Sequence, residues 1–525
     1  MCAAKSLDLY TCSFLIVFFR YSYMSSRGSP ESVAEGNSAA PGEAPRQIVR
    51  NENGVDVELV TFPPRDPENP RNWPTWRKWS IVVVIAGIDL TVSFAASGFS
   101  PASPKFSKDF GVSSEVATLG LSMTVWGFAL GPMTLAPLSE YYGRSPIYIV
   151  SYGIFLLWVL GTALVQTLGG FLVLRFLSGW FCAVTIANFG GTIADLFEPH
   201  ETGIPMSLFL WAATVGSPLG YFLFSFIAQH RPWRDVFWAL LGICGGFWLI
   251  MTATLKETRH SILLLRRAAH ERKERGTDAI EVPDSMKQRG PKELFKVALA
   301  RPFRFLFTEA IIVFGALYNG YLYGLSFLFN GAFSLVFGPK GHGFDVQGVG
   351  LSFLGIVVGI SIGPITNLLQ ERYYQRRISA MDGKNVPEAR VQMGKVAAIG
   401  KWKICKHTNV ADFEYEVFPI SLFWFAWTTY KSVHFIVPII ASAFWGWSFY
   451  TLILMTYTYT EDSYKVSYPT GTLRTETDPL FRSIVLRPSQ ASASFAIQRV
   501  VASRYSPHKC SRMRGISGRV VFWHF

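Results

Sequence analysis

The stretch "WSIVVVIAGIDLTVSFAASGF", residues 79–99, is mostly apolar and contains one ionisable residue, Asp89. A helix of about 20 apolar residues is long enough to cross the hydrocarbon core of a bilayer. Hydrocarbon offers no hydrogen-bond partners, and a helix satisfies its own backbone groups internally. The stretch therefore predicts a membrane-spanning helix.

Comparable apolar runs recur along the chain and give the fold class. Half of the 525 residues are hydrophobic and 16% are charged, against about 25% in soluble domains. Six runs precede a polar connection and four follow it. The predicted spans are 79–99, 116–137, 146–166, 169–193, 204–228, 234–255, 304–329, 347–369, 417–430 and 433–458. We therefore expect an all-α integral membrane protein, whose ninth span is shorter than a bilayer requires.

The distribution of basic residues predicts the orientation. Lysines and arginines crowd the connection at 256–303 and the one after the eighth span, whereas the opposite side has few. Connections rich in these residues stay in the cytoplasm. We expect a cytoplasmic amino terminus, and we interpret the net charge of +13 as topology and not as a sign of nucleic-acid binding.

The apolar runs and the polar segments between them give the expected domain limits. Residues 1–78 are interpreted as a disordered cytoplasmic tail, because Ser, Glu, Pro, Gly and Asn dominate them after residue 24. The other limits are 79–255 for a first six-helix half, 256–303 for a cytoplasmic loop, 304–465 for an incomplete second half, and 466–525 for a tail outside the membrane.

A short polar loop, "PLSEYYGRSPIY" at 137–148, lies between the second and third spans. Glu140 ends one predicted helix and Arg144 opens the next, with Gly143 permitting a tight turn between them. Such a charge pair can hold two helix ends together in one conformational state and release them in another. A common turn of Gly, Pro and Arg is the simpler alternative.

This loop resembles the cytoplasmic loop motif of the major facilitator superfamily, G-x-L-A-D-R-x-G-R-R. Leu138, Glu140, Gly143 and Arg144 match it in kind. Other stretches, among them "DPENPRNWPTWRKW" at 66–79 and "VPIIASAFWGWSFYTL" at 437–452, resemble fungal drug:proton antiporters, including multidrug and polyamine transporters.

The resemblance implies a helical bundle of two halves that rock about a midplane site. It further implies a monomer that exchanges small organic compounds for protons without a cofactor or a metal. The expected site is the plasma membrane, with the vacuolar membrane as the alternative.

The resemblance breaks at two places. The family normally has twelve spans, and no run here corresponds to helices eleven and twelve. The insert at 394–416 and the tail after Lys465 begin near Gly394-Lys395 and Val466-Ser467, dipeptides that codons at an intron start would encode. Retained introns are our hypothesis, and a true variant with a soluble tail is the alternative.

Ionisable residues inside spans are costly and mark function by default. Asp89 matches the acid of the antiporter first-helix pattern, and Arg175 matches the arginine of the fourth-helix motif. We expect Asp89 to carry the proton and Arg175 to be its electrostatic partner; a static ion pair is the alternative. Glu309, predicted one turn inside the seventh span, is a further acid that either functions or points to the headgroups.

The fifth span holds a partial antiporter motif in "VGSPLGYFLFS". Its residues Gly216, Pro218 and Gly220 predict a bent, closely packed helix. Any tightly packed span shows the same features, so the support for antiport is modest.

The seventh span carries a cluster of aromatic and polar residues: Tyr318, Asn319, Tyr321 and Tyr323. Aromatic rings with polar tips suit a cavity for flat apolar or cationic compounds. They also suit an aromatic belt at the membrane interface.

Other function classes remain as alternatives. A nutrient facilitator or proton symporter fits the imperfect fifth-helix motif, and a truncated, non-transporting product fits the missing helices. We expect no enzyme, because the sequence has no paired carboxylates, nucleophile–base set or phosphate loop. Its scattered cysteines and histidines predict neither a disulfide framework nor a metal site.

Overall fold

The computed structural model of the protein describes residues 47–50, 56–63, 65–198, 201–276, 280–283, 300, 304, 307–381, 387–398 and 417–466. The first part of the predicted tail at 1–78, most of the insert at 394–416 and nearly all of the tail at 466–525 lie outside these residues.

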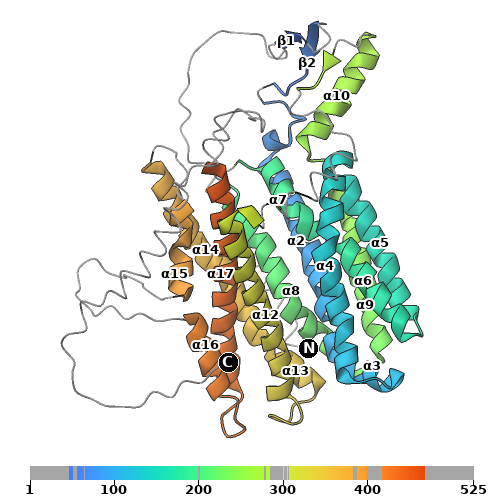
Figure 1. The fold of residues 1–525 in the computed structure, drawn as a ribbon, viewed down its shortest axis with the longest axis vertical. Coiled ribbons are helices and arrows are strands. Elements are labelled where there is room, and N and C mark those ends of the chain that lie inside the picture. Colours follow the sequence, from blue (N-terminus) through green and yellow to red (C-terminus); the bar gives the residue numbers. More distant parts are fainter. Residues whose placement is uncertain are drawn as a thin grey trace, which may run out of the picture. The chain divides into compact units, whose positions relative to one another are not determined.

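The first half is a bundle that accounts for the six predicted spans (Figure 1). Its fourth span consists of two helices that meet at Ala183. Short 3-10 turns η1 (Pro70–Asn72) and η2 (Ser100–Ala102) and helix α3 (Ser103–Phe110) flank the first span. The spans are α2 (Thr75–Ser97), α4 (Ser114–Tyr142), α5 (Arg144–Leu164), α6 (Leu168–Cys182) with α7 (Val184–Leu196), α8 (Gly203–His230) and α9 (Trp233–Thr254).

Packing in the first half encloses its opening helix. α2 packs along α8 and α9, α4 packs on α6, and α5 packs on both α6 and α9. The apolar faces of α2 therefore meet protein on several sides, and Ile85 and Ile88 are fully buried. Burial of this kind is what holds a polar residue such as Asp89 in a fixed position inside the bundle.

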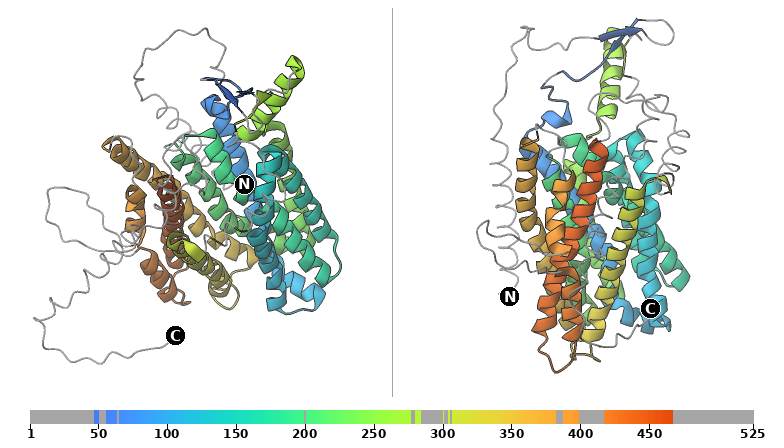
Figure 2. Two further views of the ribbon diagram at one scale, coloured as in Figure 1. Left: turned by 45° about the horizontal axis from the view of Figure 1, so that its top comes forward. Right: turned by 60° about the vertical axis from the view of Figure 1, so that its left-hand side comes forward.

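The second half has fewer long helices. Within the described residues nine helices in all are long and apolar enough to span a membrane, and the predicted ninth span is the short helix α16. The elements are α12 (Ala310–Phe337), α13 (Val346–Ser352), α14 (Leu354–Ser379), η4 (Pro387–Val391), α15 (Gln392–Ala398), α16 (Val417–Trp427) and α17 (Ile436–Val466). α14 and α17 pack side by side, as all views show (Figures 1 and 2).

The seventh span begins and ends later than the prediction of 304–329. α12 starts at Ala310 and continues to Phe337, because the apolar stretch "GAFSLVF" prolongs the helix up to Gly338.

The two halves touch along α8, which packs against α13 and α14. The helical bundle has two ends. The end that holds Arg144 and Gly203, the first residue of α8, is called the Arg144 end. The opposite end holds α3 and α13 (Figure 1). We call the contact between α8 and the second half the seam. Polar contacts cross it: Ser207 shares a hydrogen bond with Tyr450, and the Trp211 indole donates to the Ser361 hydroxyl at 3.1 Å.

A small sheet forms a separate unit, made of the described residues up to Asp66 and of 267–282. β1 (Gln47–Arg50) pairs antiparallel with β2 (Asp56–Leu59), which pairs parallel with β3 (Ile280–Glu281). The carboxyl-terminal part of α10 (His260–Arg275) joins it through a 3.2 Å ion pair between Arg275 and Glu58. Regular structure thus occupies part of the stretch that the sequence indicated as a disordered tail.

Candidate functional site

Asp89 lies at the middle of α2 with 1% of its surface exposed. The Thr185 hydroxyl of α7 donates a hydrogen bond to its Oδ1 at 3.0 Å. Its Oδ2 is buried and has no hydrogen-bond partner among the described residues. An unsatisfied buried carboxylate oxygen is costly, so this oxygen is the natural acceptor for a proton or a cation.

Two tyrosines of the second half approach Asp89. Tyr323 of α12 and Tyr457 of α17 lie close enough to the Asp89 carboxylate for an electrostatic interaction. Tyr323 also packs edge-on against Phe449 of α17. The carboxylate of the first half is therefore coupled electrostatically to two aromatic side chains of the second.

Arg175 on α6 is buried and makes a different set of bonds from the predicted one. It donates to three backbone carbonyls, those of Ala95 at 2.8 Å, Gly120 at 3.1 Å and Ala96 at 3.3 Å. Two of these belong to the last turn of α2, where carbonyls have no intrahelical partner. No ion pair joins Arg175 to Asp89, both of which are described, so their electrostatic partnership stays a prediction.

The loop motif forms a cluster around Arg144, which we call the Arg144 latch and which consists of Arg144, Ser139, Asn188, Asp195 and Glu257. The guanidinium donates to Ser139 at 2.8 Å and to Asn188 at 3.2 Å, and it pairs with Asp195 at 3.5 Å. It joins the end of α4 and the start of α5 to the end of α7.

Glu140 and Leu138, predicted members of the motif, contribute differently. Glu140 is exposed, and the acid that pairs with Arg144 is Asp195. Leu138 is half-buried within α4.

The turn at Gly143 depends on the absence of a side chain. Its φ is +104°, and a Cβ there would lie 2.3 Å from the Glu257 carboxylate. That carboxylate accepts hydrogen bonds from the backbone N–H groups of Arg144 at 3.0 Å and Ser145 at 3.3 Å. It also accepts from the N–H groups that follow it, at Thr258 and Arg259. Glu257 thus ties the start of α5 to the segment after α9, a role that the sequence did not indicate.

Glu309 does not lie inside α12, and its role as a functional acid stays a prediction. Glu309 is the residue before α12, with an extended backbone at φ −109° and ψ 105°, and not a residue one turn inside a span. Its carbonyl accepts the N–H groups of Ile312 and Val313. A half-buried carboxylate at a helix end avoids the desolvation cost that it would meet within the span.

The glycines of the fifth span make a close helix contact. A Cβ at Gly216 would lie 2.4 Å from the Ser93 Cβ, and one at Gly220 would lie 2.6 Å from the Ser97 hydroxyl. Both neighbours belong to α2, so small residues bring α8 against the helix that holds Asp89. Pro218 lies inside α8, which continues from Gly203 to His230.

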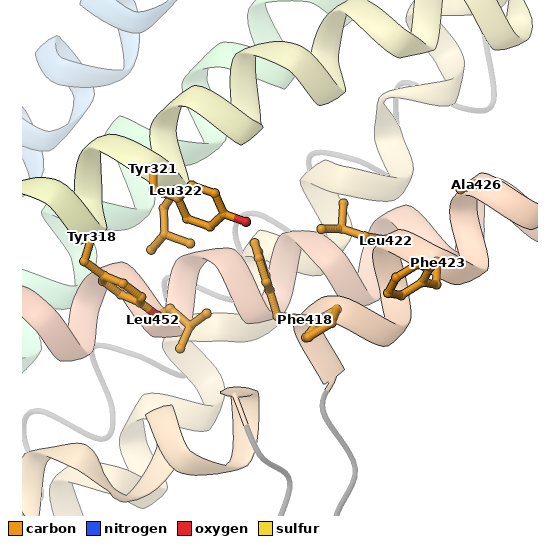
Figure 3. Close-up of a pocket in the computed structure, with 9 residues that line it drawn as sticks. Tyr318, Tyr321, Leu322, Phe418, Leu422, Phe423, Ala426 and Leu452 are labelled. Carbon is orange, nitrogen blue, oxygen red and sulfur yellow. The ribbon is translucent and has the colours of Figure 1, made fainter. Parts of the chain in front are cut away.

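The four polar and aromatic residues of α12 point to different surroundings. Tyr318 and Tyr321 line a cavity of about 560 Å³ between α12, α16 and α17. Figure 3 shows Tyr318 and Tyr321 of α12 on one side of this cavity and Phe418 and Leu422 of α16 on the other. Tyr323 packs against Phe449 instead, and the Asn319 Oδ1 is buried without a hydrogen-bond partner among the described residues.

Comparison with known proteins assigns the family. A model of the Major Facilitator Superfamily matches residues 85–381. The chain is 32% identical over 409 residues to "Efflux pump FUBT" of Fusarium oxysporum, with 78% of this chain and 66% of the relative aligned. It is 35% identical over 413 residues to "Major facilitator superfamily multidrug transporter mdrA" of Aspergillus fumigatus, covering 78% of this chain and 65% of that one.

A third relative is aligned over more of its length. The chain is 33% identical over 434 residues to "Major facilitator-type transporter sorT" of Penicillium rubens, which covers 82% of this chain and 79% of that one. The first two alignments span slightly less than two thirds of those relatives. The matched region holds Asp89, Arg144 and Arg175 in the helical positions described above, and the chain belongs to the major facilitator superfamily.

Proposed function

We propose that this protein exports small organic compounds across a membrane in exchange for protons, by alternating access of the two halves. The amino terminus and the Arg144 end face the cytoplasm in this proposal, in accord with the basic connections. The protein acts as a monomer in the plasma membrane, and the vacuolar membrane is the alternative site.

The observation that carries the proposal is the Asp89 carboxylate. It is buried at the middle of a span, its Oδ2 has no partner among the described residues, and Tyr323 of the other half interacts with it electrostatically. An ionisable group inside a membrane indicates a functional site. A carboxylate whose surroundings change as the halves rock can bind a proton in one state and release it in the other.

The nature of the substrate follows from the aromatic side chains and from the relatives' names. Tyr318, Tyr321 and Phe418 line the 560 Å³ cavity, and Tyr323 lies near Asp89. Aromatic faces bind flat apolar compounds and organic cations. Two relatives are named an efflux pump and a multidrug transporter, which supports organic compounds over sugars or ions.

Proteoliposomes test the proposal with a pH gradient and ethidium, a permanent cation that does not follow pH by simple partition. With an acidic lumen, an antiporter lets protons out and accumulates ethidium inside. We expect this accumulation for the full chain. For Asp89→Asn we expect no more ethidium inside than in vesicles without protein. Glu115→Gln, a change of an exposed acid on α4, is the control and keeps the activity.

Three outcomes contradict the proposal in different ways. Accumulation that requires an acidic exterior indicates a symporter. Equilibration without accumulation in either gradient indicates a facilitator. Absence of flux in the unmodified protein, tested across a panel of organic cations and neutral drugs, indicates a non-transporting product.

A further inference from the structure

The seam between α8 and the second half is closed at the Arg144 end by a glycine. Gly203 is the first residue of α8 and is buried. A Cβ at this position would lie 2.4 Å from the Glu371 Oε2 and 2.8 Å from the Arg390 Nη1. Real Cβ atoms do not approach so closely, so a side chain at position 203 would require the Glu371 and Arg390 side chains to move.

The charged groups opposite Gly203 are held in place. Arg390, on η4, pairs with Glu371 of α14 and donates to Asp462 of α17 at 2.8 Å. The Tyr374 hydroxyl donates to Asp462 at 2.6 Å, and the ring of Tyr374 lies 3.4 Å from the guanidinium. These groups are between 1% and 7% exposed.

The electrostatics of this cluster favour its present geometry. Burial lowers the pKa of Arg390, and attraction by Glu371 and Asp462 outweighs this effect, so that the pKa is raised above its ordinary value. Separating buried partners leaves uncompensated charge, which is costly. The cluster therefore resists a side chain at position 203 better than a flexible surface group would.

The opposite end of the same seam is closed by a second glycine. A Cβ at Gly350 of α13 would lie 2.0 Å from the Ser225 hydroxyl oxygen and 2.6 Å from the Ser225 Cβ of α8. The Ser225 hydroxyl donates to the Phe222 carbonyl at 2.7 Å, which fixes its rotamer. Next to it, Tyr221 stacks on Phe353 with 4.3 Å between the ring centroids.

These two contacts lie far apart along one continuous helix. At a rise of about 1.5 Å per residue, positions 203 and 225 of α8 are roughly 33 Å apart, about the thickness of the hydrocarbon core. Between them, Tyr450 and Ser361 of the second half bond Ser207 and Trp211 of α8. The seam thus has a glycine contact at each end and hydrogen bonds between.

We propose that α8 is a lever whose two glycine contacts, Gly203 on the Glu371–Arg390 cluster and Gly350 on Ser225, decide which end of the protein can close. A side chain at position 203 keeps the Arg144 end from closing, and one at position 350 keeps the opposite end from closing. This inference rests on the proposed alternating access.

Distances between spin labels in the full chain test the lever. One pair, at the exposed positions Glu140 and Ser379, reports on the Arg144 end; the other, at Glu115 and Lys340, reports on the opposite end. We expect Gly203→Val to raise the ratio of long to short Glu140–Ser379 distances by roughly tenfold or more, the scale of an overfilled packed contact. Gly350→Val has the same effect on the Glu115–Lys340 pair and favours short distances at the Arg144 end.

The matched control is Gly245→Val on α9, where a Cβ would meet nothing within 4 Å; it leaves both distributions unchanged. Opposite shifts from the two glycine variants support the lever, because loss of stability alone gives no opposite signs. If Gly203→Val does not fold, Gly203→Ala introduces the colliding Cβ alone.

Two results overturn parts of the picture separately. Two populations in the unmodified protein that neither variant shifts overturn the lever and leave alternating access intact. One fixed distance at each end, with and without a pH gradient and ethidium, overturns alternating access and with it the lever.

Discussion

α2 and α12 each open one half of the bundle, yet they meet different surroundings. In the span that contains α2, 72% of the most apolar 18-residue stretch is buried, against 6% for α12. α2 is enclosed by α8 and α9, whereas α12, within the described residues, packs mainly on α17 and α13. Among these residues, an apolar helix is core in one half and surface in the other, so the packing partners of a helix and not its apolar character alone determine its role.

The largest expected effect comes from filling a helix contact in the enclosed half. A Cβ at Gly179 of α6 would lie 2.2 Å from the Thr124 carbonyl oxygen of α4. Because backbone cannot rotate away, Gly179→Val should cost about 3 kcal/mol or more, the upper range for overpacking. Thermal unfolding in detergent measures it.

The matched variant for this comparison is Gly320→Val on α12, where a Cβ would meet nothing within 4 Å. It should change stability by no more than about 0.5 kcal/mol. Equal losses from the two variants would show that the halves are packed alike.

Arg175→Met should have the next largest effect. The change removes the bonds to Ala95, Ala96 and Gly120, and at about 1 kcal/mol or more for each bond we expect a loss of about 3 kcal/mol. The measurement is chemical unfolding of the single variant and of the double variant with Asp89→Asn. Because the structure forms no Asp89–Arg175 ion pair, the two effects should add; a coupling above about 1 kcal/mol would indicate that the two side chains interact.

Asp195→Asn should destabilise the Arg144 latch by about 2 kcal/mol, since it removes the charged partner of a buried arginine. Glu140→Gln changes an exposed acid of the same loop and should cost no more than about 0.5 kcal/mol. Thermal unfolding of both variants identifies the acid that stabilises the loop. A larger loss from Glu140→Gln would restore the pairing that the sequence suggested.

The smallest energetic effect is expected from a spin label at Leu328 of α12, which is 72% exposed. This label also compares the surroundings of α12 and α2 directly. We expect strong relaxation by dissolved oxygen in bilayers, because lipid reaches this position, and little loss of stability. A label at Val82 of α2, which is 1% exposed, is the contrast. Low oxygen access at Leu328 would mean that protein covers α12.

Much of the fold could be predicted from the sequence, because apolar length and turn chemistry are local properties. The starts of α4 and α6, for example, have the N-cap residues Ser113 and Thr167. The partners in the site could not be predicted in this way. Asp195 and Glu257 lie 51 and 113 residues from Arg144, and only the packed bundle brings them together.

Two further differences have physical reasons. Glu309 lies in an apolar context that suggested a span, whereas the extended backbone at this residue sets the start of α12 at Ala310. Tyr318 and Tyr323 occur close together in sequence, yet helical geometry directs them to different neighbours, the cavity beside α16 and the Asp89 region.

The bonds of Arg175 have a consequence for how the protein tolerates mutation. Its acceptors are main-chain oxygens, and every amino acid supplies one, so no particular residue type is demanded at positions 95, 96 and 120 for hydrogen bonding. Side-chain volume does constrain Gly120, where a Cβ would lie 2.6 Å from the Phe171 ring. A mutational scan should therefore find that Arg175 tolerates few substitutions although no other position covaries with it. A contact search based on paired sequence changes would not detect these three hydrogen bonds.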